Sequence, residues 1–206
     1  MKILYGTGNP SKFTHMHDYL KTIGIDIVGL KDMEGEIPSA PEDGKTVLEN
    51  ARQKAHIYYE HYKMPVFSCD SGLLLEGLPD ELQPGIHVRT VNGRYLTDDE
   101  MIDYYGGLAR RFGDITARYM NGICFIADKD HIYESADERL WGERFIITST
   151  PHHIRKAGFP LDSLSLEPQS GRYYYDISDE AANSLVEYEY FGKLLSEWLR
   201  ELDSHI

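Results

Sequence analysis

The stretch KILYGTGNPSKF, residues 2–13, decides the fold class. It opens with a short apolar segment typical of a buried strand, and the polar loop GTGNPSK follows at once. Apolar side chains then recur at helical spacing over residues 13–23, and Gly24 supplies a stop signal. Residues 25–30 have the character of a second strand. A strand, a glycine-containing loop, a helix and a strand in this order predict an α/β fold.

The loop at residues 6–12 has two interpretations. Between a strand and a helix, backbone N–H groups and the positive end of the helix dipole can hold a phosphate group. The loop is not a P-loop, which needs a Gly-Lys-Ser/Thr ending, and Ser11 stands at the third glycine position of the dinucleotide fingerprint. An ordinary turn with Ser11 near the helix start explains the same residues, so the spacing leaves both interpretations open.

Further helices and strands follow along the chain. Thr46 with Glu49 and Thr97 with Glu100 form capping-box patterns, each of which predicts the start of a helix. A hairpin is expected at residues 128–131, between two long apolar segments. The expected helices cover residues 46–62, 97–105 and 178–202, and the expected strands cover residues 64–69, 115–127, 132–145 and the tyrosines 173–175.

Length and composition exclude several classes of protein. With 206 residues, of which 41% are hydrophobic, the chain is long enough for one domain, or one domain of two lobes, with a buried core. No apolar run reaches the roughly 20 residues of a membrane span. The cysteines Cys69 and Cys124 form neither a disulfide framework nor a zinc pattern, so we expect a cytoplasmic protein.

The net charge limits the partners. At −13, with an isoelectric point of about 5.1, the chain lacks the positive footprint that nucleic-acid binding requires. A small phosphorylated ligand is still compatible with this charge, because it needs only a few local cations, N–H groups or a bridging metal. We therefore expect neither nucleic acid nor a membrane among its partners.

Asp70, in the stretch FSCDSGL at residues 67–73, ends an expected strand. An acid at the carboxyl end of a parallel strand faces the crevice where α/β folds bind ligands. If Glu42 converges on it, two carboxylates about 4 Å apart repel by roughly 4 kcal/mol at an effective dielectric constant near 20, and Mg²⁺ removes that cost. A strand-end turn of Asp70 with Ser71 and Gly72 explains the same residue types, and the spacing does not decide between them.

Other polar residues have structural explanations. Glu49 is explained as the acid of its capping box, and Arg52 and Lys54 are most simply solvated helix positions. His152 and His153 are neighbours in sequence, and neighbouring side chains rarely point to the same place. We therefore do not expect the two histidines to bind one metal.

Four motifs together resemble one enzyme family. TGNPSK, EDGKTVLENARQKA, CDSGL and PGI occur in this order within residues 3–86, which is under half of the chain. The set is similar to the inosine triphosphate pyrophosphatase family, enzymes that remove non-standard purine nucleotides. The resemblance implies an elongated α/β fold of two lobes, with a long mixed sheet flanked by helices and a central cleft. It also implies a homodimer that uses Mg²⁺ to hydrolyse a nucleoside triphosphate to the monophosphate and pyrophosphate.

The same resemblance implies roles for individual residues. Glu42 and Asp70 would bind the metal and carry catalysis, with Asp70 orienting or deprotonating the attacking water. Lys54 would contact phosphate, and Ser71 would lie beside the ligand. Phe159 and Asp162 match part of the family's base pocket. The residues that would hold the phosphates are Thr7, Gly8, Asn9, Ser11 and Lys12.

The chain departs from the family in two places. The family has two consecutive acids where this chain has Cys69 and Asp70, and a thiol is a poor ligand for Mg²⁺. The family's Ser-His-Arg motif is absent, and Ala182 and residues 187–188 stand in place of later cations and polar groups. Base specificity is therefore expected to differ from the family's preference for inosine nucleotides.

Three functions compete at this point. The first, which we expect, is a Mg²⁺-dependent nucleoside triphosphate pyrophosphohydrolase with an altered base pocket. The second is a nucleotide-binding sensor or partner protein without turnover, which Cys69 and the altered base pocket favour. The third is a Maf-like pyrophosphatase that acts on modified pyrimidine nucleotides.

Overall fold

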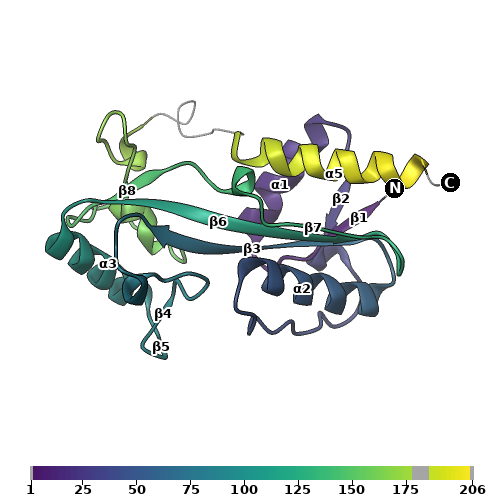
Figure 1. Cartoon of the computed structure of the whole chain (residues 1–206), viewed down its shortest axis with the longest axis horizontal. Coiled ribbons are helices and arrows are strands. Elements are labelled where there is room, and N and C mark those ends of the chain that lie inside the picture. Colours follow the sequence, from purple (N-terminus) through teal and green to yellow (C-terminus); the bar gives the residue numbers. More distant parts are fainter. Residues whose placement is uncertain (1, 178–185, 205–206) are drawn as a thin grey trace. The chain divides into compact units, whose positions relative to one another are not determined.

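The computed structural model of the chain describes residues 2–177 and 186–204. Its main sheet is mixed, with the strand order β2-β1-β3-β6-β8-β9 and with β7 paired to β6 (Figure 1). Helices flank this sheet, which confirms the α/β class predicted from the sequence. The strands of the sheet are β1 (Ile3–Tyr5), β2 (Ile27–Gly29), β3 (Val66–Leu75), β6 (Ile115–Ile126), β7 (Ile132–Ser135), β8 (Phe145–Ile147) and β9 (Ser165–Leu166).

The chain divides into two compact units. The first consists of the described residues of Met1–Ser71, Met120–Trp141 and Leu185–Ile206, and the second consists of those of Gly72–Tyr119 and Gly142–Ser184. Strands β3 and β6 contribute residues to both units. The central cleft that the resemblance implies stays a prediction.

In the first unit, β1 lies between β2 and β3 and is parallel to both. Helix α1 (Pro10–Thr22) connects β1 to β2, and helix α2 (Val47–Tyr62) lies in the connection from β2 to β3. Helices α1 and α5 (Val186–Ser204) cover one face of the sheet, and α2 covers the other (Figure 1). Because successive connections lead to opposite sides of β1, a ligand crevice is expected beyond the carboxyl ends of β1 and β3.

Buried apolar side chains hold these helices against the sheet. Met16 and Leu20 of α1 pack in one cluster with Phe191 of α5. Ala51 and Ala55 of α2 are fully buried in a second cluster on the other face. Small residues let α2 lie close to the strands, and this closeness places the polar side chains of α2 near the sheet.

Helix α2 lies close to strand β6 at Gly122. A Cβ atom added at Gly122 would lie 2.9 Å from the backbone nitrogen of Leu48 and 3.0 Å from its Cα. Backbone atoms cannot move aside as a flexible side chain can, so only glycine fits here without shifting the helix. Gly122 therefore fixes the height of the N-terminal end of α2 above the sheet.

The second unit is built around helix α3 (Asp98–Phe112). Thr97 caps this helix, and it forms with Glu100 the capping box that the sequence predicts. Tyr105 of α3 is fully buried in a cluster with Leu73 and Ile147. The unit also contains the hairpin of β4 (Thr90–Val91) and β5 (Arg94–Tyr95) and the 3-10 helices η2 (Asp80–Leu82), η4 (Pro160–Leu164) and η5 (Tyr174–Asp176).

The strand expected over residues 64–69 begins and ends later than predicted. β3 runs from Val66 to Leu75, so Asp70 lies inside the strand and the strand-end turn proposed for it is wrong. Apolar side chains buried beyond Asp70 extend the strand. β1 pairs with β3 only as far as Phe67, opposite Tyr5. Asp70 therefore still lies past the carboxyl end of the parallel pair.

Three other expected elements need correction. Residues 132–145 are not one strand but β7, the 3-10 helix η3 (Glu138–Leu140) and β8, although the hairpin between β6 and β7 is confirmed. Helix α3 continues past residue 105 to Phe112, and its later residues Leu108 and Ala109 are buried in the core of the second unit. The tyrosines 173–175 do not form a strand, since η5 begins at Tyr174.

The C-terminal helix is present as α5, which also contributes the aromatic ring of Trp198 to the core. Residues 178–185 of the helix predicted over 178–202 lie outside the described residues. Within 2–177 and 186–204, no helix is both long enough and apolar enough to cross a membrane. The cytoplasmic location stays a prediction.

Candidate active site

The loop between β1 and α1 is shaped by its own side chains. Asn9 caps α1, and its Oδ1 accepts hydrogen bonds from the backbone N–H groups of Ser11 (2.9 Å) and Lys12 (3.2 Å). Pro10 at the first helical position favours the same helix start. Gly6 begins the loop where a Cβ atom would lie 2.3 Å from Ser68 Oγ. The sequence thus builds a tight loop directly before α1. The positive end of the α1 dipole lies at this loop.

On the α2 face of β3, two predicted acids share one lysine. The ammonium group of Lys54 donates to Oδ1 of Asp70 at 2.7 Å and to Oε1 of Glu42 at 3.0 Å. The other oxygen of Asp70 accepts a hydrogen bond from Asn50 Nδ2 at 3.0 Å. Oδ1 of Asn50 in turn accepts the backbone N–H of Gly44 at 2.9 Å. The structure therefore brings Glu42, Lys54 and Asp70 together and holds Asp70 by both oxygens.

Burial and charge act in opposite directions on Lys54. The residue is only 8% exposed, and this burial opposes the charged form, but the carboxylates of Asp70 and Glu42 outweigh it and raise the pKa of Lys54. Lys54 is therefore not the solvated helix position that the sequence favours on its own. Asp70 is equally buried, whereas the side chain of Glu42 is 59% exposed.

On the opposite face of β3, a second lysine has only neutral partners. The ammonium group of Lys12 donates to Ser71 Oγ at 3.0 Å, and Ser71 donates to Asn121 Oδ1 at 2.7 Å. Nδ2 of Asn121 donates to the backbone oxygen of Leu140 at 2.7 Å, which ends the chain of bonds. In the described part of the chain, no carboxylate forms an ion pair with Lys12.

The lack of a close carboxylate changes the acidity of Lys12. Burial lowers its pKa below the ordinary lysine value, and the nearby charge of Lys54 lowers it further. Asp70 and Glu42 act in the other direction without cancelling the shift. Lys12 is thus an uncompensated cation beside the β1–α1 loop, which is what an anionic ligand needs.

Cys69 points to the side of Lys12, because consecutive residues of a strand face opposite sides of a sheet. It packs with Tyr5 and Met16 in the cluster beneath α1 and α5. Burial raises the pKa of the Cys69 thiol to about 12, so the group is neutral near pH 7. A neutral thiol does not bind Mg²⁺, and it leaves the Asp70 face of the strand unchanged.

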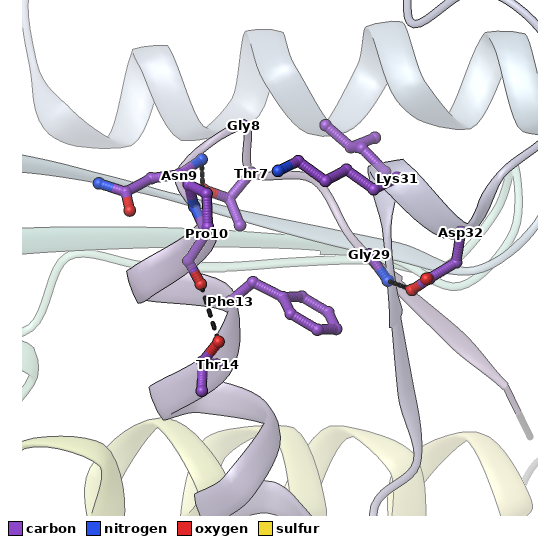
Figure 2. Close-up of a pocket in the computed structure, with 10 residues that line it drawn as sticks. Thr7, Gly8, Asn9, Pro10, Phe13, Thr14, Gly29, Lys31 and Asp32 are labelled. Carbon is purple, nitrogen blue, oxygen red and sulfur yellow. Dashed lines mark hydrogen bonds between the residues drawn. The ribbon is translucent and has the colours of Figure 1, made fainter.

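A cavity of about 160 Å³ adjoins the other side of the same loop (Figure 2). Phe13 of α1 forms one wall, and the side chain of Lys31 reaches across from the end of β2 toward Thr7 (Figure 2). Lys31 belongs to the 3-10 helix η1 (Leu30–Asp32), where Asp32 accepts the backbone N–H of Gly29 at 2.8 Å. Lys31 is a further cation near the loop that the sequence analysis did not select.

The donor set on the α2 face fits a hard divalent cation. Glu42 and Asp70 direct carboxylate oxygens at one point, now held by the ammonium of Lys54, and Mg²⁺ prefers oxygen ligands. Among the residues that the structure describes, no group of three or more His, Cys, Asp and Glu side chains could hold a metal. The two carboxylates of Glu42 and Asp70 would therefore supply part of the coordination of a divalent cation, and water or a bound ligand would supply the rest.

The two adjacent histidines do not form a metal pair. Nδ1 of His152 accepts the backbone N–H of Ile154 at 3.1 Å, and its Nε2 lies 3.3 Å from Oδ1 of Asp176. Both ring nitrogens of His152 thus have partners within the fold. His153 packs its ring against His152, with centroids 4.2 Å apart.

Phe159 and Asp162, the two remaining predicted residues, belong to the second unit. Phe159 caps η4, and the ammonium of Lys156 lies 4.4 Å from the centre of its ring. Burial raises the pKa of Asp162, and the charge of Lys156 opposes this shift. An aromatic ring, a cation and a carboxylate therefore lie close together in this unit.

The sequence analysis missed Asn50 and Asn121, which orient Asp70 and Ser71. Asn50 precedes Lys54 by one helical turn, so the two polar side chains share the face of α2 that packs on the sheet. A polar pair on a buried helix face was a signal that could have identified Asn50. Asn121 lies in a long apolar strand, and a single buried amide in such a strand was the corresponding signal.

A comparison with known families decides the relationship. The sequence model of the Ham1 family matches residues 3–186. This chain belongs to the Ham1 family. The match confirms the predicted resemblance to the inosine triphosphate pyrophosphatases. Proteins similar to this chain over nearly its full length are named dITP/XTP pyrophosphatases.

Several Ham1 relatives are similar to the chain. A dITP/XTP pyrophosphatase of Lactobacillus acidophilus is 36% identical over 98 residues, which are 47% of this chain and 48% of that protein. A dITP/XTP pyrophosphatase of Methylococcus capsulatus is 28% identical over 98% of this chain and 97% of its own length. The chain therefore aligns with the second relative from end to end and with the first over about half its length.

Solved Ham1 structures share the fold. A HAM1 protein from Coxiella burnetii superposes with a TM-score of 0.74 and 21% identity, covering 96% of this chain and 99% of that one. The Ham1 protein of Staphylococcus aureus gives a TM-score of 0.72 and 19% identity, covering 98% and 99%. These likenesses confirm the mixed α/β architecture with a long sheet flanked by helices.

Proposed function

We propose that this chain hydrolyses a nucleoside triphosphate to the nucleoside monophosphate and pyrophosphate. The meeting of Glu42, Lys54 and Asp70 beside the β1–α1 loop carries the proposal. Relatives that align over nearly the full chain are named dITP/XTP pyrophosphatases, which supports the same reaction class. Attack of water at the α-phosphorus with pyrophosphate as the leaving group gives these products, and attack at the β-phosphorus with the monophosphate as the leaving group would give the same pair. We propose attack at the α-phosphorus.

The first unit supplies the cations that a triphosphate needs. The positive end of the helix dipole at the start of α1 attracts one phosphate group, while the N–H groups of Ser11 and Lys12 are bound by the cap residue Asn9. Lys12 brings a charge that no close carboxylate neutralises. Lys31 stands on the other side of the same loop (Figure 2). Positioning and charge neutralisation of this kind supply most of the rate enhancement in phosphoryl chemistry.

Asp70 is the residue best placed to handle the attacking water. Asn50 holds one of its oxygens, which fixes the plane of the carboxylate, and the other oxygen accepts a hydrogen bond from the ammonium of Lys54. Glu42 and Asp70 would hold Mg²⁺, which would lower the pKa of bound water and neutralise charge on pyrophosphate. The carboxylate of Asp70 would then accept the water proton.

The proposal extends to the residues that select the nucleotide base. Phe159 offers a ring and Asp162 a partly buried carboxylate, and Lys156 lies beside both. The family's Ser-His-Arg motif is missing from the sequence, so we propose that the preferred substrate carries a non-standard or modified base other than hypoxanthine, the base of inosine nucleotides.

The test is a panel of standard and modified nucleoside triphosphates incubated with the protein and Mg²⁺. Pyrophosphate release that disappears in Asp70→Asn supports the proposal. Release of orthophosphate would mean attack at another phosphorus and would refute the mechanism. Nucleotide binding without any release across the panel, at high protein concentration, would favour a sensor or partner protein instead. Turnover confined to pyrimidine nucleotides would favour the Maf-like alternative.

Assembly needs a separate measurement. The homodimer implied by the family resemblance is a proposal for this chain. Sedimentation equilibrium of the purified protein tests it, with twice the mass of the 23.6 kDa chain expected. A single species at the mass of one chain would contradict it.

A further inference from the structure

We propose that Lys54 occupies the position of the divalent cation between Glu42 and Asp70, and that metal binding displaces it. The inference deepens the proposed function, because it concerns how the same site is loaded. Lys54 then has two successive partners: the two carboxylates before the metal arrives, and the phosphate chain of the substrate afterwards.

The contacts of Lys54 define the position. Its Nζ donates to Asp70 at 2.7 Å and to Glu42 at 3.0 Å, so oxygens from two separate segments converge on one nitrogen atom. A Mg²⁺ ion held by both carboxylates would need ligand distances of about 2.0–2.1 Å. An ion bound through Oδ1 of Asp70 and Oε1 of Glu42 would lie where the ammonium lies, so at these two oxygens the ammonium and the metal exclude each other by volume and by charge.

The ammonium of Lys54 explains how the carboxylates of Glu42 and Asp70 can lie together. Lys54 and Asp70 are each only 8% exposed, so an unpaired Asp70 carboxylate would be costly there. The ammonium satisfies Asp70 and draws in Glu42, whose own side chain is largely exposed. The site is thus preformed by a cation that belongs to the chain.

The structure also provides for the departure of Lys54. Asn50 binds the second oxygen of Asp70 independently of Lys54, so the carboxylate keeps one anchor when the ammonium leaves. A lysine carries its charge on a flexible stem of four carbons and can redirect it without moving the helix. The charge of Lys54 already lies close enough to Lys12 to lower the pKa of Lys12. A phosphate group beside Lys12 is therefore within the influence of a released Lys54.

The consequence is an ordered loading of the site. Without metal, Lys54 is engaged by Glu42 and Asp70 and is not available to phosphate. Once a divalent cation takes its place, Lys54 is free to bind the polyphosphate. The metal, or a metal–nucleotide complex, thus prepares the phosphate site that a nucleotide alone would find incomplete.

The test measures Mn²⁺ binding in the absence of nucleotide, by the electron paramagnetic resonance signal of free Mn²⁺. Lys54→Met removes the competing cation and is expected to bind Mn²⁺ at least 10-fold more tightly than the unchanged chain. Lys12→Met is the matched control, because it removes an equal charge from the neighbourhood without releasing the two carboxylates. We expect it to tighten binding by less than a third of the Lys54→Met effect.

Two outcomes would overturn the inference. Equal or weaker Mn²⁺ binding by Lys54→Met would show that Lys54 does not compete for the position. Equal tightening in the two variants would show a general effect of charge instead of displacement. Adding Glu42→Gln to Lys54→Met should abolish the gain, and a gain that survives would place the metal elsewhere.

A measurement on the unchanged chain avoids any folding defect of the variants. In protein labelled with ¹⁵N-lysine, the ammonium resonance of Lys54 should move and lose its protection from exchange as Mg²⁺ is added. An unchanged Lys54 resonance at saturating Mg²⁺ would overturn the inference. The proposed function fails separately, because a chain that hydrolyses no nucleotide can still exchange Lys54 for a metal.

Discussion

The two faces of strand β3 place a buried lysine in opposite electrostatic environments. On one face, Lys54 is surrounded by carboxylates that raise its pKa. On the other face, Lys12 has neutral hydrogen-bond partners and a pKa lowered by burial. The difference arises from strand geometry, because Asp70 points to one side while Cys69 and Ser71 point to the other.

This comparison explains what the cysteine changes. Where the family has a second acid, this chain places a neutral thiol on the Lys12 face. The charge that is lost would have faced Lys12, and the Glu42–Lys54–Asp70 cluster remains complete. The cysteine therefore affects the balance of charge around Lys12 more than it affects the Glu42–Lys54–Asp70 cluster.

The largest effect is expected from Asp70→Asn. The change keeps the shape of the side chain but removes the base and a metal ligand, so we predict a fall in kcat of about 10³-fold or more. Steady-state kinetics with the best substrate of the panel measure it, with circular dichroism to verify folding. Retention of more than a tenth of the activity would contradict a catalytic role for the Asp70 face.

A smaller effect is expected from Lys12→Met on the opposite face. Loss of the uncompensated cation should lower kcat/KM by about 100-fold, because the charge that develops on the polyphosphate loses a partner. Lys21→Met, in the last turn of α1, is the control for a lysine outside the candidate site. Similar kinetics for Lys12→Met and Lys21→Met would remove Lys12 from the site.

The two lysines should also differ in how stability depends on pH. The pKa of Lys12 is lowered from 10.5, so between its folded value and 10.5 the unfolded chain binds a proton that the folded chain does not. Stability contributed through Lys12 therefore rises with pH in that window. The pKa of Lys54 is raised above 10.5, so its contribution is present below 10.5 and is lost as pH rises through the folded value.

Urea unfolding at a series of pH values tests this difference. The free energy of unfolding of the unchanged chain, minus that of Lys12→Met, should increase as pH rises toward 10.5. The same difference taken with Lys54→Met should decrease above 10.5. Parallel curves for the two lysine variants would contradict the contrast between the two faces.

The smallest effect is expected from Cys69→Ser. The thiol is neutral near pH 7 and lies on the side away from Glu42 and Asp70, so kcat should change by less than about threefold. A loss comparable to that of Asp70→Asn would mean that the thiol takes part in the reaction. Equal kinetics for Cys69→Ser and the unchanged chain would support Asp70 as the residue of this segment that is required for catalysis.

The sequence was sufficient to predict those parts of the fold that depend on residues close together in the chain. The order of strand, loop and helix over residues 2–23 predicted the α/β class, and the capping box at Thr97 predicted the start of α3. The end of β3 could not be predicted, because its extension depends on neighbours that bury both of its faces. The same holds for the tyrosines 173–175, where the 3-10 helix η5 begins at Tyr174 in place of the expected strand.

Long-range contacts limited prediction of the candidate site. The residue types of Glu42, Lys54 and Asp70 indicated phosphate and metal chemistry only through the family motifs. Their meeting depends on Gly122 letting α2 approach β6 and on Asn50 joining two segments. The contacts of Gly122 and Asn50 join segments that are far apart in the sequence, so a periodic pattern of residues cannot predict them.

Hydrolysis in ¹⁸O-labelled water tests the proposed reaction most directly. A single turnover of the best substrate, followed by mass spectrometry, shows which phosphorus the water attacks. We predict that the label appears in the nucleoside monophosphate and that pyrophosphate is unlabelled. Label in pyrophosphate, or release of labelled orthophosphate, would contradict attack at the α-phosphorus beside Asp70.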